Sequence, residues 1–389
     1  MPAATALPPQ QGTANPAGGA SAAQVIPFAQ ASHHGCEQGP SFTFTPSTNQ
    51  QTFGPFPLPA TGYLRRIVLE FSTTTPGTGG TASNDYPHSL SALIRLTDTN
   101  GAPIYELSGY NTLLADTYGG YAGSPDYRID PDYSSSATAP ALSPYVPLEI
   151  SPDGVGSPAN LSASSAYRLT VLIDTLGNNF STPPSPVEAM SCTVWCEFWS
   201  LPAPTDARGR QQAVAPPYSG TMGLWSQQPN ITVNPGSQRL PLNRMGNLLR
   251  TVIVVFRVAG VRSDAVTGDP VTLRWDDINL DVTSRRMFRK RMREYVNDLT
   301  ARDVGVYVFG LYNYGVERNV GGLSVVSWLP TVTSTRYEVN TPSGGSAGTI
   351  DWIINDVTVS STAPDQRAAV GGSGVQFHPP VAPVIPGAA

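Results

Sequence analysis

Apolar and polar residues alternate in several short runs along the chain, and this period of two is typical of β-strands with one buried face. In the run 192–199, Cys192, Val194 and Cys196 share one face, while polar and aromatic residues occupy the other. Similar runs are 64–71, 93–97, 104–107 and 167–174. The chain between its two ends is therefore predicted to consist mainly of strands.

The spacing of the two cysteines in that run predicts their chemistry. Residues four apart on a strand have Cα atoms about 13 Å apart, at ~3.3 Å per residue, whereas a disulfide needs less than about 7 Å. Cys192 and Cys196 are therefore predicted to be buried, free thiols. No further Cys or His lies nearby at a ligand spacing, so no zinc site is expected.

One strand pattern occurs twice in the chain. A run that ends at Phe71 follows Pro57-Leu58, and a similar run that ends at Phe256 follows Pro241-Leu242. The separation of about 185 residues is far longer than a solenoid unit of ~20–50 residues. The repeat therefore indicates two similar domains in tandem, with Phe71 and Phe256 at equivalent core positions.

Each half then continues with further short strands and its best helical segment. These helical segments are 111–118 in the first half and 284–299 in the second. Units of roughly 150 residues with short antiparallel strands are typical of β-sandwiches, of which the jelly roll is a large version. The fold class is therefore predicted to be all-β, with two tandem jelly-roll barrels and a short helix in each.

The two ends of the chain differ from the middle in composition. They are rich in Ala, Pro, Gln and Gly and carry few charges, which is typical of flexible, low-complexity segments. Within the N-terminal end, the short run 24–28 is the part expected to dock onto a surface. The predicted limits are a flexible N-terminal arm at 1–40, jelly roll 1 at 41–205, a linker at 206–222, jelly roll 2 at 223–362 and a Pro-rich C-terminal arm at 363–389.

Composition limits the classes of protein that the chain can form. Its 389 residues include 37 Gly and 38 Pro, and 13% are charged, about half the usual share of ~25%. So many turn formers exclude coiled coils and helical solenoids, and the net charge of −5 argues against wholesale coating of nucleic acid. No apolar run reaches the ~18 residues of a membrane span. No signal peptide is recognised, so the chain is expected to be made in a cytosol.

Residues suited to catalysis are scarce. Of the four histidines, His33, His34 and His378 lie in the predicted arms, which leaves His88 for the rest of the chain. A single histidine cannot build a cupin-type metal site, and it offers little for a Ser-His-Asp or Cys-His arrangement. No enzyme activity, metal or cofactor is therefore expected.

Carboxylates and aromatic residues leave alternatives open. Glu70 and Glu197 lie on predicted strands, and Trp195 and Trp199 would be able to stack on a sugar, as in a glycosidase or a carbohydrate-binding protein. The three aspartates between 126 and 132 fit a calcium site or, more simply, a polar turn.

The strongest charge pattern lies in the helical segment of the second half. Apolar residues spaced four, three and four apart between Phe288 and Leu299 predict an amphipathic helix. Its six cations are Arg285, Arg286, Arg289, Lys290, Arg291 and Arg293. Two arginines in the first turn are unfavourable for the helix dipole. The basic face is either solvated or in contact with an acidic partner, namely a neighbouring subunit, phospholipid head groups or packaged nucleic acid.

The two similar β halves, the sparsely charged arms and the repeated strand at 57–71 and 241–256 together resemble a viral major capsid protein. The resemblance extends over about residues 40–362. It is to the double jelly-roll lineage, which includes the tectivirus-like, tailless phages with a membrane and the adenovirus hexon.

The resemblance implies a structural function and a set of partners. Three subunits would form a pseudo-hexameric homotrimer, and the trimers would tile an icosahedral shell that encloses the viral genome, in some members over an inner lipid membrane. Further copies of the chain and a penton or minor capsid protein are the expected partners, with no sequence-specific binding of nucleic acid. The expected location is the virion, after synthesis in the host cytoplasm. The alternatives are a carbohydrate-binding or adhesive β-sandwich protein, such as a phage spike or a lectin, and a carboxylate glycosidase.

Overall fold

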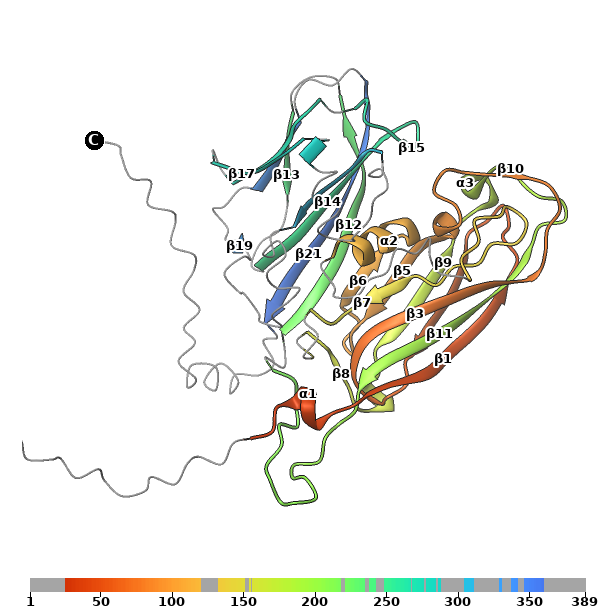
Figure 1. Ribbon diagram of the computed structural model, residues 1–389. Coiled ribbons are helices and arrows are strands. Elements are labelled where there is room, and N and C mark those ends of the chain that lie inside the picture. Colours follow the sequence, from red (N-terminus) through yellow and green to blue (C-terminus); the bar gives the residue numbers. More distant parts are fainter. Residues whose placement is uncertain are drawn as a thin grey trace, which may run out of the picture.

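Each half of the chain folds into eight main strands that form two facing sheets (Figure 1). The computed structural model of the protein describes residues 25–119, 132–150, 154, 156–217, 221–234, 238–242, 248–266, 268–275, 278–284, 286–287, 304–310, 329–330, 337–341 and 346–359.

The first jelly roll extends from β1 to β11. One sheet has the strand order β1-β11-β3-β7, and the other has the order β2-β9-β5-β6. The strands of the first sheet are β1 (His34–Phe44), β11 (Ala189–Trp199), β3 (Gly62–Thr75) and β7 (Tyr145–Pro147). Those of the second are β2 (Gln51–Pro57), β9 (Arg168–Ile173), β5 (Ser91–Thr97) and β6 (Pro103–Leu107). Three short strands are added, namely β8 (Ala159–Asn160) beside β3, and β4 (Thr81–Ala82) beside β10 (Phe180–Thr182).

The second jelly roll repeats this topology. Its sheets have the orders β12-β21-β14-β18 and β13-β20-β16-β17. The strands of the first sheet are β12 (Thr221–Val233), β21 (Gly348–Val359), β14 (Leu248–Val258) and β18 (Val306–Gly310). Those of the second are β13 (Gln238–Leu242), β20 (Tyr337–Thr341), β16 (Val271–Trp275) and β17 (Ile278–Thr283). The short strands β15 (Val261–Arg262) and β19 (Leu329–Pro330) pair with β14.

The strand orders of the two halves are identical when the main strands are counted along the chain. In each half, strands 1, 8, 3 and 6 form one sheet and strands 2, 7, 4 and 5 form the other. Eight antiparallel strands in two facing sheets are a jelly roll. The predicted fold class, two tandem jelly rolls, is therefore confirmed.

Within the described residues, three α-helices of four or more residues accompany the strands, namely α1 (Phe28–Ala31), α2 (Gly109–Tyr118) and α3 (Leu176–Asn179). The helix predicted in the first half is α2, and the Ser108 side chain caps it by accepting a hydrogen bond from the backbone N–H of Asn111 at 3.3 Å. In the second half, Ser284 Oγ accepts from the N–H of Met287 at 3.1 Å, and residues 286–287 are helical. The rest of that predicted helix, 285 and 288–299, lies outside the described residues. No helix in the described part of the chain is long and apolar enough to cross a membrane.

Alternation of side chains along the strands builds the two cores. Ile67, Leu69 and Phe71 of β3 all lie in the core of the first jelly roll. In β14, both faces are buried, because Phe256 lies in the core of the second jelly roll and Ile253 joins the core of the first. Phe71 and Phe256 thus occupy the third strand of their own jelly roll and face its core, as the repeat predicted.

The N-terminal segment departs from the prediction of a flexible arm over 1–40. The strand β1 begins at His34, and α1 precedes it. The ring of Phe28 is buried and packs against Tyr63 and Trp199, with ring centroids 5.4 and 5.7 Å away. The low-complexity composition gave no sign of this structure. A single buried aromatic side chain is enough to hold a short segment in place. Within the run 24–28, which was expected to dock onto a surface, Phe28 packs against other residues of the same chain.

The cysteines agree with the strand prediction. Cys192 and Cys196 are buried free thiols on the inner face of β11, and Cys36 is an exposed free thiol on β1. Burial raises the pKa of both inner thiols, and that of Cys196 rises to about 12. Since the thiolate is the reactive form, the inner thiols are protected both sterically and electronically.

We expect one reactive thiol in the folded, unassembled subunit. Alkylation at pH 8 should modify Cys36 of the subunit rapidly and leave Cys192 and Cys196 unmodified until the protein unfolds. Mass spectrometry of tryptic peptides, with a sample in denaturant as the control, measures this directly. Rapid labelling of Cys192 or Cys196 in the native protein would contradict their place in the core.

Candidate functional site

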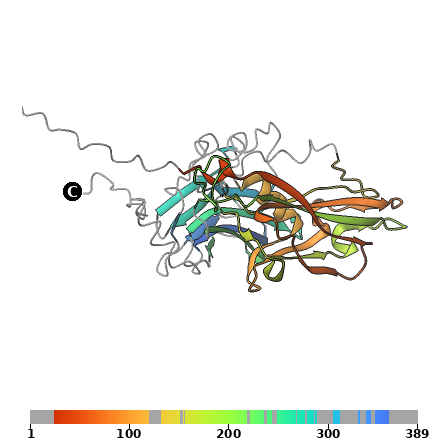
Figure 2. The same cartoon turned by 90° about the horizontal axis from the view of Figure 1, so that it is seen from below.

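The two jelly rolls are joined by a shared sheet. Strand β6 of the first pairs in parallel with β12 of the second, with Tyr105 opposite Trp225 and Glu106 opposite Ser226. The Tyr105 and Trp225 side chains are both buried. The pairing extends one sheet of the first jelly roll into one sheet of the second, in the order β15-β14-β21-β12-β6-β5-β9-β2. Figure 2 shows the two jelly rolls side by side along this sheet.

Helix α2 fills the angle between the jelly rolls (Figure 1). Its buried residues Leu113, Leu114 and Tyr118 belong to the core of the first jelly roll. The same apolar cluster includes Val308 and Ile353 from the second jelly roll. The core of the first half is therefore continuous with the outer face of the sheet β12-β21-β14-β18, and α2 lies where the two halves meet.

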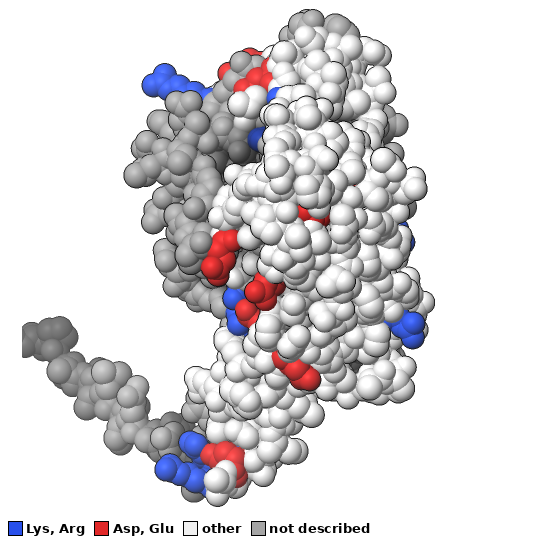
Figure 3. All heavy atoms as spheres, turned by 90° about the vertical axis from the view of Figure 1, so that its right-hand side faces the viewer, with Lys and Arg blue, Asp and Glu red and all other residues white. Residues whose placement is uncertain are grey.

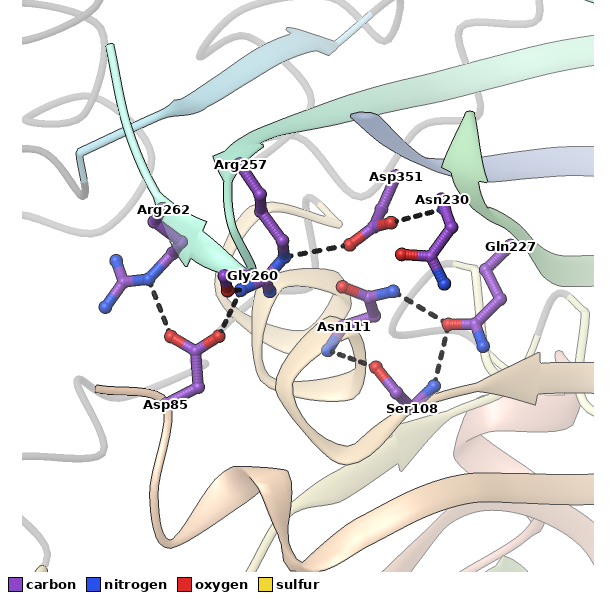
Figure 4. A network of polar contacts seen from close by, with 9 residues as sticks. All are labelled: Asp85, Ser108, Asn111, Gln227, Asn230, Arg257, Gly260, Arg262 and Asp351. Atoms are coloured by element: carbon purple, nitrogen blue, oxygen red, sulfur yellow. Dashed lines mark hydrogen bonds and ion pairs between the residues drawn. The ribbon is translucent and has the colours of Figure 1, made fainter. Parts of the chain in front are cut away.

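Hydrogen bonds fix the start of α2 to β12 (Figure 4). The amide oxygen of Gln227 accepts from the backbone N–H of Ser108 at 2.8 Å and from Asn111 Nδ2 at 2.7 Å. One side chain of the second jelly roll thus satisfies two donors at the first turn of the helix. Each such bond contributes about 1 kcal/mol, and leaving its donor unsatisfied costs about 1–3 kcal/mol.

Ion pairs form a second link at the same junction (Figure 4). The carboxylate of Asp85 accepts from Arg257 at 2.5 Å and from Arg262 at 2.7 Å. Arg257 also donates to Asp351 at 3.0 Å, and both guanidinium groups lie within 5.4 Å of the Tyr110 ring of α2. Burial alone would lower the pKa of Arg257, but Asp85 and Asp351 outweigh it and raise the pKa. The cluster combines two carboxylates with two arginines, so the local charge is balanced.

A buried arginine links the end of α2 to the second jelly roll. Arg250 Nη1 of β14 donates to the carbonyl oxygen of Gly119 at 2.6 Å and to Asn355 Oδ1 at 3.1 Å. A cation at the C-terminal end of a helix also interacts favourably with the helix dipole. The helix is therefore held at both ends by side chains of the second jelly roll.

These junction residues could not be identified from the sequence, although one signal was present. Residues 252–256 are apolar without alternation, which is typical of a strand buried on both faces. The outer face of β14 therefore needed a covering element, and α2 with the first core supplies it. Asp85, Arg257 and Gln227 carried no comparable signal, because their partners are more than 90 residues away in sequence.

The basic residues singled out from the sequence lie mostly beyond the described part of the chain. Arg286 is described and exposed, at the start of the helical segment. The other five lie outside the described residues, namely Arg285, Arg289, Lys290, Arg291 and Arg293. Their proposed contact with an acidic partner stays a prediction.

The carboxylate pair considered for glycosidase chemistry does not have the required geometry. Glu70 lies opposite Thr193, and Glu197 lies four residues further along β11, which separates them by about 13 Å. Glycosidases need about 5–9.5 Å between the two carboxyl groups. Glu70 instead accepts from Trp195 Nε1 at 2.6 Å, and Glu197 pairs with Arg66 at 2.7 Å.

Trp199, considered for stacking on a sugar, and His88, considered as a metal ligand, are both buried by packing within the chain. Trp199 is buried against Phe28, so it does not present a free surface for stacking. His88 is buried beside Tyr133, and burial lowers its pKa to about 4, which keeps the ring neutral near pH 7. Within the described ranges, no group of three or more His, Cys, Asp or Glu is placed to hold a metal ion. Of the three aspartates between 126 and 132, only Asp132 is described.

Charged side chains are sparse on one described face of the molecule (Figure 3). Figure 3 shows a face on which acidic and basic residues are isolated spots on a largely uncharged background. This agrees with the 13% of charged residues in the whole chain. Such a surface is able to be covered by another protein at a small electrostatic cost.

Comparison with known proteins identifies the fold. No protein-family model and no curated sequence matches the chain. Among solved structures, the major capsid protein of Sulfolobus turreted icosahedral virus matches with a TM-score of 0.57 and 13% identity, over 87% of this chain and 99% of that one. The major capsid protein P2 of bacteriophage PM2 matches with 0.50 and 11% identity, over 85% and 99%. PBCV-1 VP54 matches with 0.51 and 12% identity, over 84% and 94%. The chain therefore has the double jelly-roll fold of viral major capsid proteins.

Removing the central carboxylate of the junction should weaken the whole fold. Asp85→Ala removes the shared partner of Arg257 and Arg262, whose side chains are 13% and 19% exposed, so we expect a loss of about 2 kcal/mol in the free energy of unfolding. The ion pair Arg95–Glu106 is more exposed, with side chains that are 43% and 32% accessible, and provides the control, because Arg95→Ala should cost less than about 1 kcal/mol. Urea unfolding followed by tryptophan fluorescence measures both. Equal effects from the two substitutions would mean that the Asp85 cluster is not a structural link.

Proposed function

We propose that the protein is the major capsid protein of an icosahedral virus, located in the virion. The observation that carries the proposal is the rigid fusion of two jelly rolls of identical topology through a shared sheet. A fold of the same kind, over 84–87% of the chain, occurs in three viral capsid proteins.

Geometry supports a trimeric building block. Each chain contains two similar jelly rolls side by side, which we call its two wedges. A threefold axis through three chains therefore gives a ring of six wedges. A ring of six similar wedges has a nearly hexagonal outline, which tiles a surface without gaps. Closed rotational symmetry is also the usual outcome for homo-oligomers. The native unit is therefore a pseudo-hexameric homotrimer, and the trimers tile a shell around the genome.

The sparse surface charge fits extensive burial between subunits. Charged groups are costly to bury without partners, and the cores of protein interfaces are depleted in them. The low-complexity terminal segments have a role in the same assembly, because they are able to order as extended straps across neighbours. Further partners are a penton or minor capsid protein and, in a virus with an inner membrane, its lipid head groups.

Light scattering and negative-stain microscopy of the purified protein test the proposal. We expect a particle of three chains and, under assembling conditions, closed shells of uniform size. A monomer at every protein concentration, salt concentration and pH would overturn it. The alternative, a carbohydrate-binding protein, predicts a small oligomer that binds glycans and forms no shells.

The basic segment is expected to act in assembly rather than in folding. Charge reversal at Arg289, Arg291 and Arg293 should reduce shell yield or retention of genome or membrane, because a clustered positive face attracts an acidic partner. Thermal stability of the trimer should change little, since exposed charge pairs contribute only ~0.3–0.5 kcal/mol each. Reversal of the exposed residues Arg168 and Arg208 is the matched control. Normal shells from the triple variant would show that the basic residues are only solvated and have no role in assembly.

A further inference from the structure

Two further strand edges correspond to the two edges that pair at the junction inside one chain. In each jelly roll, the fifth main strand ends one sheet and the first main strand ends the other. Strand β6 is the fifth of its jelly roll and β12 is the first of its own, and these two pair within the chain. The corresponding strands are β17 and β1, and each pairs on one side only within the described residues. Figure 1 places β17 and β1 on opposite sides of the molecule.

Strand pairing shows which residue of β1 corresponds to Gln227. On the second jelly roll, Gln227 lies opposite Ile353, which lies opposite Ile253 of β14. On the first, Gln38 lies opposite Trp195, which lies opposite Val68 of β3. Val68 and Ile253 stand at the same place in the repeated strand, three residues before Phe71 and Phe256. Gln38 therefore corresponds to Gln227.

The same counting places Cys36 at the position of Trp225. Each lies two residues before its glutamine, and each is followed by a register shift, between Gln38 and Ser41 in β1 and between Gln228 and Ile231 in β12. A shared bulge near the same point gives the two edges a similar twist and bend.

The residues that cap the two helical segments show which residue of β17 corresponds to which residue of β6. Ser108 caps α2 by accepting from the N–H three residues later, and Ser284 does the same for the helical segment that follows β17. Tyr105 and Asp281 each lie three residues before their cap. Each also lies opposite a buried core residue of the adjacent strand, Leu96 for Tyr105 and Leu273 for Asp281. Asp281 therefore corresponds to Tyr105.

We propose that the edge of β17 in one copy of the chain pairs in parallel with the edge of β1 in the next copy, in the register that β6 and β12 use within the chain. Asp281 of one copy then lies opposite Cys36 of the next. The amide oxygen of Gln38 accepts from the backbone N–H of Ser284, as Gln227 does from Ser108. This contact rests on the proposed capsid function and specifies how the subunits of the trimer meet.

The exposed residues of the two edges fit this partner. Cys36, Glu37 and Gln38 are all exposed on β1, and Val282 on β17 is 46% exposed. Glu37 on one edge and Arg286 just beyond the other have opposite charges, which favours this pairing over contact between identical edges. The contact joins different edges, so it repeats from subunit to subunit and closes into a ring.

An engineered disulfide tests the register. Opposite residues on neighbouring strands have Cα atoms about 5 Å apart, within the range of a disulfide. In the full-length protein carrying Asp281→Cys, mild oxidation should link that cysteine to Cys36 of the neighbour and give covalent dimers and trimers on non-reducing gels. The series should stop at three chains, because a threefold ring has three such contacts.

Two variants serve as matched controls for the disulfide. Val282→Cys places a thiol one residue away on the opposite face of β17, and Asp281→Cys combined with Cys36→Ser removes the partner thiol. Neither should give linked trimers. Two results would overturn the contact and leave the capsid function standing. One is a trimer by light scattering with no disulfide link in Asp281→Cys, and the other is a trimer with equal linking in Asp281→Cys and Val282→Cys. A protein that stays monomeric throughout would overturn both.

Substitution of Gln38 tests the hydrogen bond. Gln38→Leu removes the acceptor, so the dissociation constant of the trimer should rise roughly tenfold. Gln38→Glu retains an acceptor oxygen at the same place and should stay within about threefold of the parent protein. Sedimentation across a dilution series measures both, and unchanged thermal unfolding of the subunit shows that folding is intact. Equal dissociation constants for the two variants would contradict the assigned role of Gln38.

Discussion

The parallel pairing of β6 with β12 is the interaction on which the rest of the structure depends. It joins sheets of the two jelly rolls into one, and it places α2 between the core of the first half and the outer face of the second. Two jelly rolls linked only by a flexible segment would adopt many relative orientations, and the entropy of fixing them would oppose assembly. The shared sheet removes that cost, because the relative orientation of the two jelly rolls is already fixed within each chain.

Polar groups at this junction make the orientation specific. Apolar burial is nondirectional, whereas the bonds of Gln227 to the start of α2 and of Arg250 to its end are satisfied only in one arrangement. The Asp85 cluster adds a charge-balanced contact between the same two halves. This specificity suits the proposed capsid function, because small errors in the angle between the two jelly rolls would accumulate around a ring of subunits.

Much of the fold could be predicted from the sequence, because it rests on local patterns and on a repeat. Alternation fixed the inner face of β11 and hence the free thiols Cys192 and Cys196. The repeated run that ends at Phe71 and Phe256 predicted two similar domains. The docking of Phe28 and the junction contacts could not be predicted, since they join residues far apart in the chain. The separation of Glu70 and Glu197 likewise required the register of β3 against β11, which composition does not reveal.

The central claim is that the shared sheet and the junction make the two jelly rolls one structural unit. Differential scanning calorimetry tests it directly, because independently stable domains unfold in separate transitions. We expect a single transition whose calorimetric and van't Hoff enthalpies agree, at a concentration where the oligomeric state is known. Two resolved transitions, one for each jelly roll, would contradict the claim.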